Sequence, residues 1–226
     1  MMLHIPTVLS RAQVDEIRSH LASAEWVDGA ATAGPMAASI KRNLQLPADA
    51  PLAQQLADQI AATLARHPLF MSAVLPKQIL TPRFNRYEGG GQYGNHVDNA
   101  VQSDSLRRVS VRTDVSTTVF LSDPQEYEGG ELVIEDGYSQ RMVKLAAGDA
   151  IVYPATSLHR VEPVTQGTRY ASFLWTQSMV RDAWQRNMLF DLDMTIIKLR
   201  QKHGNTPEAL ALTNHYHNLL RQWAEL

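Results

Sequence analysis

A central stretch rich in β-branched and aromatic residues constrains the fold of this chain more than any other feature of its sequence. From residue 77 to residue 176, short runs of Val, Ile, Thr, Phe and Tyr are separated by Gly, Asp and Pro, a pattern typical of short strands joined by turns. Short strands at this spacing favour a β-sandwich or a jelly roll. We expect strands at residues 79–87, 93–97, 117–121, 130–135, 140–145, 150–154 and 170–176, with turns at Gly129-Gly130 and Asp136-Gly137.

Helical patterns precede the β-rich stretch. Ser10 is a suitable N-cap for a first helix, with Gln13 as its capping-box partner. Pro51 suits the first turn of a second helix. A short strand is expected at residues 3–5, and alternating apolar and polar residues predict a single strand at residues 40–46.

Two further helices are expected after the last strand. Apolar residues recur every four positions, at Val180, Trp184, Met188 and Leu192. Gly204 is a natural helix stop, and Thr206-Pro207 opens a second helix. The expected class is therefore mainly β with flanking helices (α+β), ending in a helical hairpin.

The chain divides into three expected regions. Residues 1–77 form a strand and helix region packed on the core, residues 78–178 form the β-rich core, and residues 179–226 form a C-terminal helical extension. The extension, of about fifty residues, is too short to bury a core of its own. Its apolar faces should therefore pack on the β-rich core, or form a homodimer.

Composition excludes several kinds of protein. Among the 226 residues there is no Cys, which excludes disulfide scaffolds, thiolate metal sites and cysteine nucleophiles. The formal net charge is −2 and there is no strongly basic stripe, so nucleic acid is not an expected partner. No apolar run is long enough to predict a membrane span, and the first residues do not form a signal-peptide pattern. We expect a cytoplasmic protein.

Three residues of the β-rich stretch form a metal-ligand pattern, His96-Val97-Asp98 followed later by His159. Alternate residues of a strand share a face, so His96 and Asp98 can converge on one ion. His159 follows the strand expected at residues 150–154 and would complete the site from a loop. Two histidines and one carboxylate leave positions open on a metal and suit non-haem Fe(II) chemistry with oxygen.

Arg169 opens the last expected strand and shares a face with Phe173 and Trp175, which should point into the barrel. A charge there is costly unless it is paired. Its partner could be the distal carboxylate of an organic-acid co-substrate, which arginine binds as a fork. It could equally be a protein acid such as Glu162 or Asp149. Together with the triad, the first alternative suggests an oxygenase that consumes 2-oxoglutarate.

Two tyrosines precede the His-x-Asp motif, Tyr87 and Tyr93. Either phenol could hydrogen-bond a co-substrate, although a half-buried aromatic residue in a strand is the more ordinary interpretation. We select Tyr87 as the pocket residue.

These motifs resemble one known family. The run RFNRYEGGGQYGNHVD at residues 83–98, YEGGEL at residues 127–132 and the segment from Gly148-Asp149 to His159 are similar to the bacterial branch of the prolyl/lysyl-hydroxylase-type (PKHD-type) Fe(II)/2-oxoglutarate dioxygenases. The C-terminal helices also resemble that branch. The resemblance implies a double-stranded β-helix (jelly roll), with Fe(II) on His96, Asp98 and His159. It also implies 2-oxoglutarate anchored by Arg169, and dependence on L-ascorbate.

The expected function is hydroxylation of an unidentified small-molecule or peptide substrate, coupled to decarboxylation of 2-oxoglutarate to succinate and CO2. Two alternatives remain open at this point. One is a cupin-like metalloenzyme that uses the same ligands without 2-oxoglutarate. The other is a non-enzymatic iron or oxygen sensor whose C-terminal helices bind a partner. Formation of succinate distinguishes the first function from both alternatives.

Overall fold

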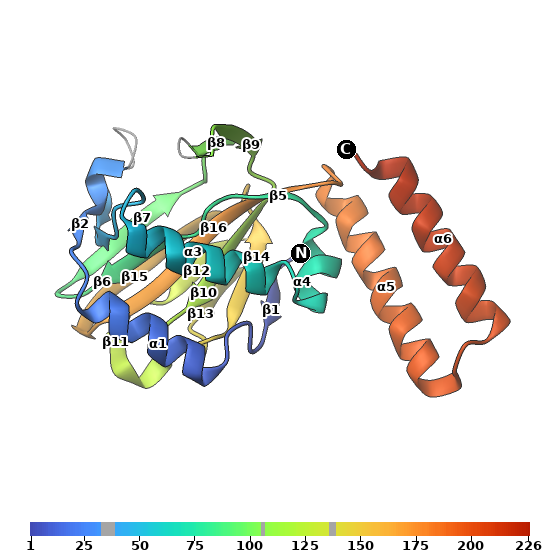
Figure 1. Ribbon diagram of the computed structural model, residues 1–226, viewed down its shortest axis with the longest axis horizontal. Coiled ribbons are helices and arrows are strands. Elements are labelled where there is room, and N and C mark those ends of the chain that lie inside the picture. The colour runs from blue at the N-terminus through green and yellow to red at the C-terminus, as the bar shows by residue number, and fades with distance from the viewer. Residues whose placement is uncertain (33–38, 105–106, 136–138) are drawn as a thin grey trace.

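Two antiparallel sheets form the centre of the computed structural model, which describes residues 1–32, 39–104, 107–135 and 139–226 (Figure 1). The eight-stranded sheet contains β1 (Leu3–Ile5), β2 (Val27–Asp28), β4 (Leu44–Gln45), β5 (Pro76–Ile79), β6 (Arg83–Tyr87), β10 (Val115–Phe120), β14 (Ala150–Pro154) and β16 (Arg169–Ser178). The six-stranded sheet contains β3 (Lys41–Arg42), β7 (Gly91–His96), β11 (Tyr127–Gly129), β12 (Leu132–Glu135), β13 (Gln140–Val143) and β15 (Leu158–Gly167). The expected mainly β fold is thereby confirmed.

Strands that are distant in sequence lie side by side in both sheets. The larger sheet has the order β1-β14-β10-β16-β6-β4-β2, with β5 also paired to β16. The smaller has the order β13-β12-β15-β7-β3, with β11 also paired to β15. A separate hairpin is formed by β8 (Val101–Asp104) and β9 (Val109–Arg112). As a result, β7, which ends just before residue 98, and β15, which begins at residue 158, are neighbours in the smaller sheet.

Several segments differ from the sequence-based expectation. The strand expected at residues 79–87 is two strands, β5 and β6, and Pro82 between them cannot donate a ladder hydrogen bond. The strand expected at residues 40–46 is also two strands, because β3 pairs with β7 in the smaller sheet whereas β4 pairs with β6 in the larger. The ten-residue strand β15 was not expected. The turn expected at Asp136-Gly137 lies outside the described residues.

Three helices cover one face of the larger sheet, namely α1 (Arg11–Ala22), α3 (Pro51–Leu64) and α4 (Pro68–Val74). The expected capping box is present, with Ser10 and Gln13 bonded to each other. Figure 1 shows α1 and α3 in front of the strands. Their buried residues join those of the sheet in one apolar cluster, which includes Val14, Ile17, Leu21, Leu56, Ile60, Phe70, Phe84, Val119 and Val152. This cluster anchors the helices and stabilises the sheet.

The chain ends in the expected helical hairpin of α5 (Ala183–His203) and α6 (Pro207–Trp223), beside the sheets in Figure 1. Asp182 caps α5, so the helix begins after Val180 rather than at it, and Thr206 caps α6. Val180 instead packs against Leu75 of the core and apolar residues of α6. None of the described helices is both long and apolar enough to span a membrane.

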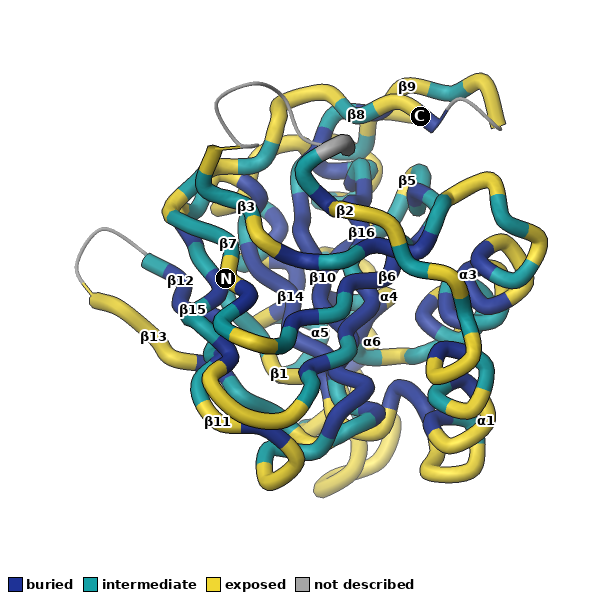
Figure 2. The backbone as a smooth tube through the Cα atoms, turned by 90° about the vertical axis from the view of Figure 1, so that its left-hand side faces the viewer, coloured by how far each residue is buried: buried dark blue, intermediate teal, exposed yellow. Residues whose placement is uncertain are grey.

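A second apolar cluster lies on the inner faces of the sheets. It contains Tyr87 and Phe120 from the larger sheet and Leu132, Ile134 and Val164 from the smaller. Burial follows this layering, since β10 and β14 at the centre are buried whereas β13 at an edge is largely exposed (Figure 2). The inner faces also carry polar and charged residues, which line the site described next.

Candidate active site

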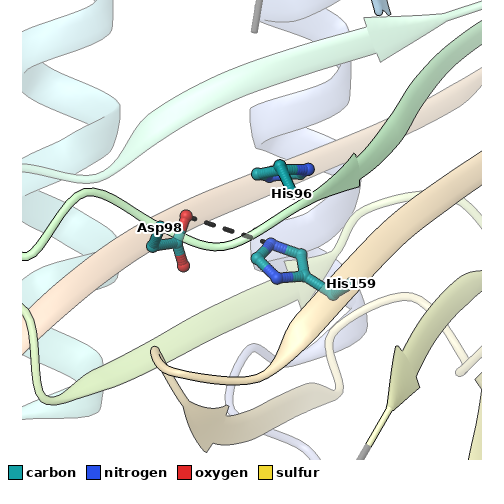
Figure 3. A group of neighbouring side chains, drawn as sticks. All are labelled: His96, Asp98 and His159. Carbon is teal, nitrogen blue, oxygen red and sulfur yellow. Dashed lines mark ion pairs between the residues drawn. The ribbon is translucent and has the colours of Figure 1, made fainter. Parts of the chain in front are cut away.

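Two histidines and one aspartate lie together where β7 and β15 run side by side (Figure 3). His96 is the last residue of β7, Asp98 lies just past it, and His159 is near the start of β15. One potential ligand atom from each lies within 4.8 Å of those of the other two. The 3.9 Å between His159 Nε2 and Asp98 Oδ1, dashed in Figure 3, is too long for a hydrogen bond. The three side chains are thus close enough to share one metal ion.

The pairing of β7 with β15 explains why the histidines meet. His159 is paired with His96, and Val161 with Tyr93. Two residues of β7 therefore face a single residue of β15 between these pairs, a bulge that turns Tyr93 and His96 to the same face. Their rings stack with centroids 3.6 Å apart. The expectation that His159 lies in a loop is wrong, because it occupies a strand that is hydrogen-bonded to β7.

Both histidines are held in the form that binds a metal. His96 Nδ1 lies 2.8 Å from the carbonyl oxygen of Gly94, and His159 Nδ1 lies 3.0 Å from that of Ser157. A carbonyl can only accept, so each Nδ1 carries the proton and each Nε2 keeps a lone pair. Burial, with a contribution from His159, lowers the pKa of His96 to about 4. His96 is therefore neutral at neutral pH, as a metal ligand must be.

The carboxylate of Asp98 is oriented from the opposite sheet. Ser116, in β10, donates its hydroxyl to Asp98 Oδ2 at 2.5 Å. The other oxygen, Oδ1, is the one nearer His159. A hydrogen bond to one carboxylate oxygen fixes the direction of the other, which is how many proteins orient the carboxylate ligands of a metal.

The triad borders a cavity of about 760 Å³, which is lined by residues of both sheets. Side chains alternate along a strand, so every second residue of β6 and β16 faces this space. These residues are Arg83, Asn85 and Tyr87 on β6, and Arg169, Ala171, Phe173 and Trp175 on β16. A space of this size can enclose a small organic molecule together with part of a second one.

Arg169 is almost completely buried, with 1 % of its surface exposed. No acid among the described residues forms an ion pair with it, and its Nε has no hydrogen-bond partner. Both protein acids that sequence reasoning left open are paired elsewhere, Glu162 with Arg160 and Asp149 with His4. A buried guanidinium at a cavity wall without an acidic partner is costly unless a ligand supplies the anion.

Tyr87 lies beside Arg169, whose guanidinium carbon is 5.3 Å from the centre of the phenol ring. Gln45 donates to Asn85 at 3.0 Å, and Asn85 donates to the Tyr87 hydroxyl at 3.2 Å. Burial raises the pKa of Tyr87, so the phenol stays protonated. With one amide already donating to its oxygen, the phenol can donate its own proton, either to the side chain of Asn43 beside it or to a ligand.

Sequence reasoning missed other residues of this site. Asn85 and Arg83 alternate with Phe84, a pattern that marks a polar inner face and could have been recognised. Ser116 carries no local signal, because only the fold brings β10 opposite Asp98. The stacking of Tyr93 on His96 depends on a β-bulge in β7, which no pattern in the sequence indicates.

Comparison with family models and known sequences gives a consistent result. Residues 82–177 match the model of the 2OG-Fe(II) oxygenase superfamily, and residues 183–225 match the PKHD-type hydroxylase C-terminal domain. The chain is 64 % identical over 225 residues to a PKHD-type hydroxylase of Hyphomonas neptunium, with 100 % of both chains covered. It is 52 % identical over 226 residues to the PKHD-type hydroxylase PiuC of Pseudomonas aeruginosa, again over 100 % of each.

Solved structures with the same fold include a prolyl-4-hydroxylase from Pseudomonas putida, with a TM-score of 0.51 and 20 % identity over 78 % of this chain and 92 % of that one. HygX from Streptomyces hygroscopicus, solved with nickel, 2-oxoglutarate and hygromycin B, has a TM-score of 0.54 and 19 % identity over 79 % of this chain and 84 % of HygX. These likenesses confirm the jelly-roll fold. By its full-length sequence similarity, the chain belongs to the PKHD-type hydroxylases of the 2OG-Fe(II) oxygenase superfamily.

Proposed function

We propose that this enzyme hydroxylates its substrate with Fe(II) held by His96, Asp98 and His159, and with 2-oxoglutarate anchored by Arg169 and Tyr87. The donor set fits the metal, because two neutral imidazoles and one carboxylate are the ligands of non-haem Fe(II) oxygenases. When bound, iron and 2-oxoglutarate supply the oxygen chemistry, in which decarboxylation to succinate and CO2 accompanies hydroxylation of the substrate.

The observation that carries the proposal is the buried Arg169. Its guanidinium lines the same cavity as the triad and has no acidic partner among the described residues. The distal carboxylate of 2-oxoglutarate would supply the missing anion through charge-assisted hydrogen bonds. Tyr87, which stays protonated and lies beside Arg169, would donate a further hydrogen bond to the same group.

The remaining residues hold this arrangement in place. The carbonyls of Gly94 and Ser157 fix the tautomers of the two histidines, and Ser116 orients Asp98. The two sheets exclude bulk water from the cavity walls, which strengthens the electrostatic interactions inside. L-Ascorbate, implied by the family, would sustain turnover as a reductant. We assign it no binding residue.

The test is succinate formation by the Fe(II)-loaded enzyme in the presence of oxygen and 2-oxoglutarate, measured without substrate as slow uncoupled turnover. We expect His96→Ala and Asp98→Ala to abolish succinate formation and to lose iron on dialysis. His203→Ala is the matched control, because His203 is exposed on α5, and it should keep both properties. Full succinate formation by either triad variant would refute the ligand assignment.

A further inference from the structure

The cavity has a second cationic end, apart from Arg169. Four charged residues line it among those the structure describes, and they are Lys41, Arg83, Asp98 and Arg169. Asp98 is a proposed metal ligand and Arg169 a proposed anchor of the co-substrate. No other carboxylate belongs to the described lining, and the acids that influence Lys41 and Arg83 electrostatically, Asp28 and Asp104, lie outside it. The charge of this end favours an anionic ligand.

Arg83 is held in place by an aromatic ring rather than by an acid. Its guanidinium carbon lies 5.4 Å from the centre of the Trp175 ring, a cation–π contact. No ion pair or hydrogen bond joins its side chain to a residue in the described part of the chain. Asp104 exerts an electrostatic influence on it, but the carboxylate of Asp104 is hydrogen-bonded to Thr81 and to the backbone N–H of Arg107. The five donors of this guanidinium are therefore available to a ligand.

Lys41 approaches the same end from the smaller sheet. Its Nζ lies 5.3 Å from the centre of the Tyr93 ring, which in turn stacks on His96. Burial and the nearby charge of Arg83 lower the pKa of Lys41 to about 8. Lys41 is thus mostly charged at neutral pH while close enough to Arg83 to be repelled by it. An anion bound by both residues would relieve this repulsion.

The two cationic ends start from distant backbone positions. In the β6–β16 pairing, Arg169 lies opposite Tyr87, whereas Arg83 lies opposite Phe173. Four residues of strand separate the two arginines, about 13 Å at the usual rise per residue. With its distal carboxylate at Arg169 and its keto acid toward the triad, as proposed above, 2-oxoglutarate does not use the end at Arg83. The end at Arg83 is therefore left for a different anionic molecule.

We propose that the primary substrate of this hydroxylase carries a carboxylate that Arg83 and Lys41 bind, with an apolar body against Phe173 and Trp175. The two rings pack edge to face, 5.5 Å apart between centroids, and give the end an apolar wall beside its cationic groups. Arginine suits this role because its planar fork matches a carboxylate. The inference rests on the proposed function, since it assumes that 2-oxoglutarate occupies the end at Arg169.

The experiment uses the Zn(II)-loaded enzyme, which cannot turn over, with saturating 2-oxoglutarate. The probes are aliphatic and aromatic monocarboxylates, including 3-phenylpropanoate, each paired with its neutral amide of the same size. Binding is measured by saturation-transfer NMR and calorimetry. We expect the acids to bind at millimolar concentration or below, and each amide to bind about tenfold more weakly or worse. Equal binding of acids and amides, or no binding by any acid at millimolar concentration, would overturn the proposal.

Variants test whether Arg83 and Lys41 cause the preference for acids over amides. Arg83→Gln and Lys41→Gln should each weaken acid binding about tenfold and leave the affinity for 2-oxoglutarate unchanged. Arg83→Lys keeps the charge but loses the fork. It should bind acids more tightly than Arg83→Gln and less tightly than the wild type. Arg86→Gln is the matched control, because Arg86 is on the same strand but paired with Glu88 outside the cavity lining, and it should bind acids as the wild type does.

Failure of this proposal is distinguishable from failure of the proposed function. The affinity for 2-oxoglutarate is measured first, on the same metal-loaded protein. If 2-oxoglutarate does not bind, the proposed function itself fails. If 2-oxoglutarate binds but Arg83→Gln leaves acid binding unchanged, or weakens 2-oxoglutarate binding instead, only the substrate assignment is overturned.

Discussion

The two faces of the strand pair β6–β16 carry very different residues. On the face toward α1 and α3, Phe84 is 1 % exposed and belongs to the large apolar cluster. On the cavity face, its neighbours Arg83 and Asn85 are followed by Tyr87, with Arg169 opposite on β16. Alternation along the strand lets one segment serve both faces. Apolar burial on the helix face can therefore stabilise a sheet whose other face holds a buried charge.

The comparison predicts that substitutions on the two faces have different effects. A substitution on the helix face should reduce the free energy of unfolding and leave ligand affinity unchanged in the protein that remains folded. A substitution on the cavity face should weaken ligand binding without reducing the free energy of unfolding. Three variants test this difference, starting with the one of largest expected effect.

Phe84→Ala should lower the free energy of unfolding by about 3–5 kcal/mol, because it removes a buried ring and leaves a space in the apolar cluster. Chemical denaturation followed by circular dichroism measures this change. The folded fraction should bind 2-oxoglutarate as tightly as the wild type does. A large loss of 2-oxoglutarate affinity at unchanged stability would show that the helix face determines ligand binding, which would contradict the comparison.

Arg169→Met should weaken 2-oxoglutarate binding by about 2–5 kcal/mol, which is about 30-fold or more in Kd. Met keeps most of the side-chain volume, so the walls formed by Tyr87 and Phe120 should stay packed. The free energy of unfolding should be unchanged or higher, since a buried charge has been removed. Calorimetric titration and denaturation on the same sample report both quantities, and a large loss of stability at unchanged affinity would contradict the anchoring role.

Ser116→Ala should have a smaller effect, weakening metal binding about 10- to 100-fold by releasing the carboxylate of Asp98 from its hydrogen bond. Competition with a metal chelator measures this affinity. Ser110→Ala, at an exposed position of the β8–β9 hairpin, serves as the control and should bind metal normally. Equal affinities in the two variants would show that Ser116 does not position Asp98.

Much of the fold could be predicted because its causes are local. The capping box at Ser10, the proline at position 51 and the strand at residues 150–154 all lie where the sequence indicates. β15 was missed because its residues Arg160, Glu162 and Pro163 look like a loop. Its strand conformation comes from pairing with β7 on one side and β12 on the other, which is a property of the tertiary structure.

The three residues of the triad could be chosen from the sequence, but the geometry of the site and several of its other residues could not. His96, Asp98 and His159 are indicated by residue type and order, and the structure brings them together. Alternation alone would put Tyr93 and His96 on opposite faces, and the bulge reverses this. Nor could the sequence choose between a protein acid and a ligand as the partner of Arg169. That choice depends on which acids the fold has already paired.

The most direct test of the central claim is an anaerobic titration of the Fe(II)-loaded enzyme with 2-oxoglutarate, followed by visible absorption. Chelation of the iron by the keto acid should produce a charge-transfer band. We expect this band in the wild type, its absence in His96→Ala, and a much higher 2-oxoglutarate requirement in Arg169→Met. Absence of the band in wild-type protein that demonstrably holds iron would contradict the account. The triad would then serve an enzyme that does not use 2-oxoglutarate, or a sensor.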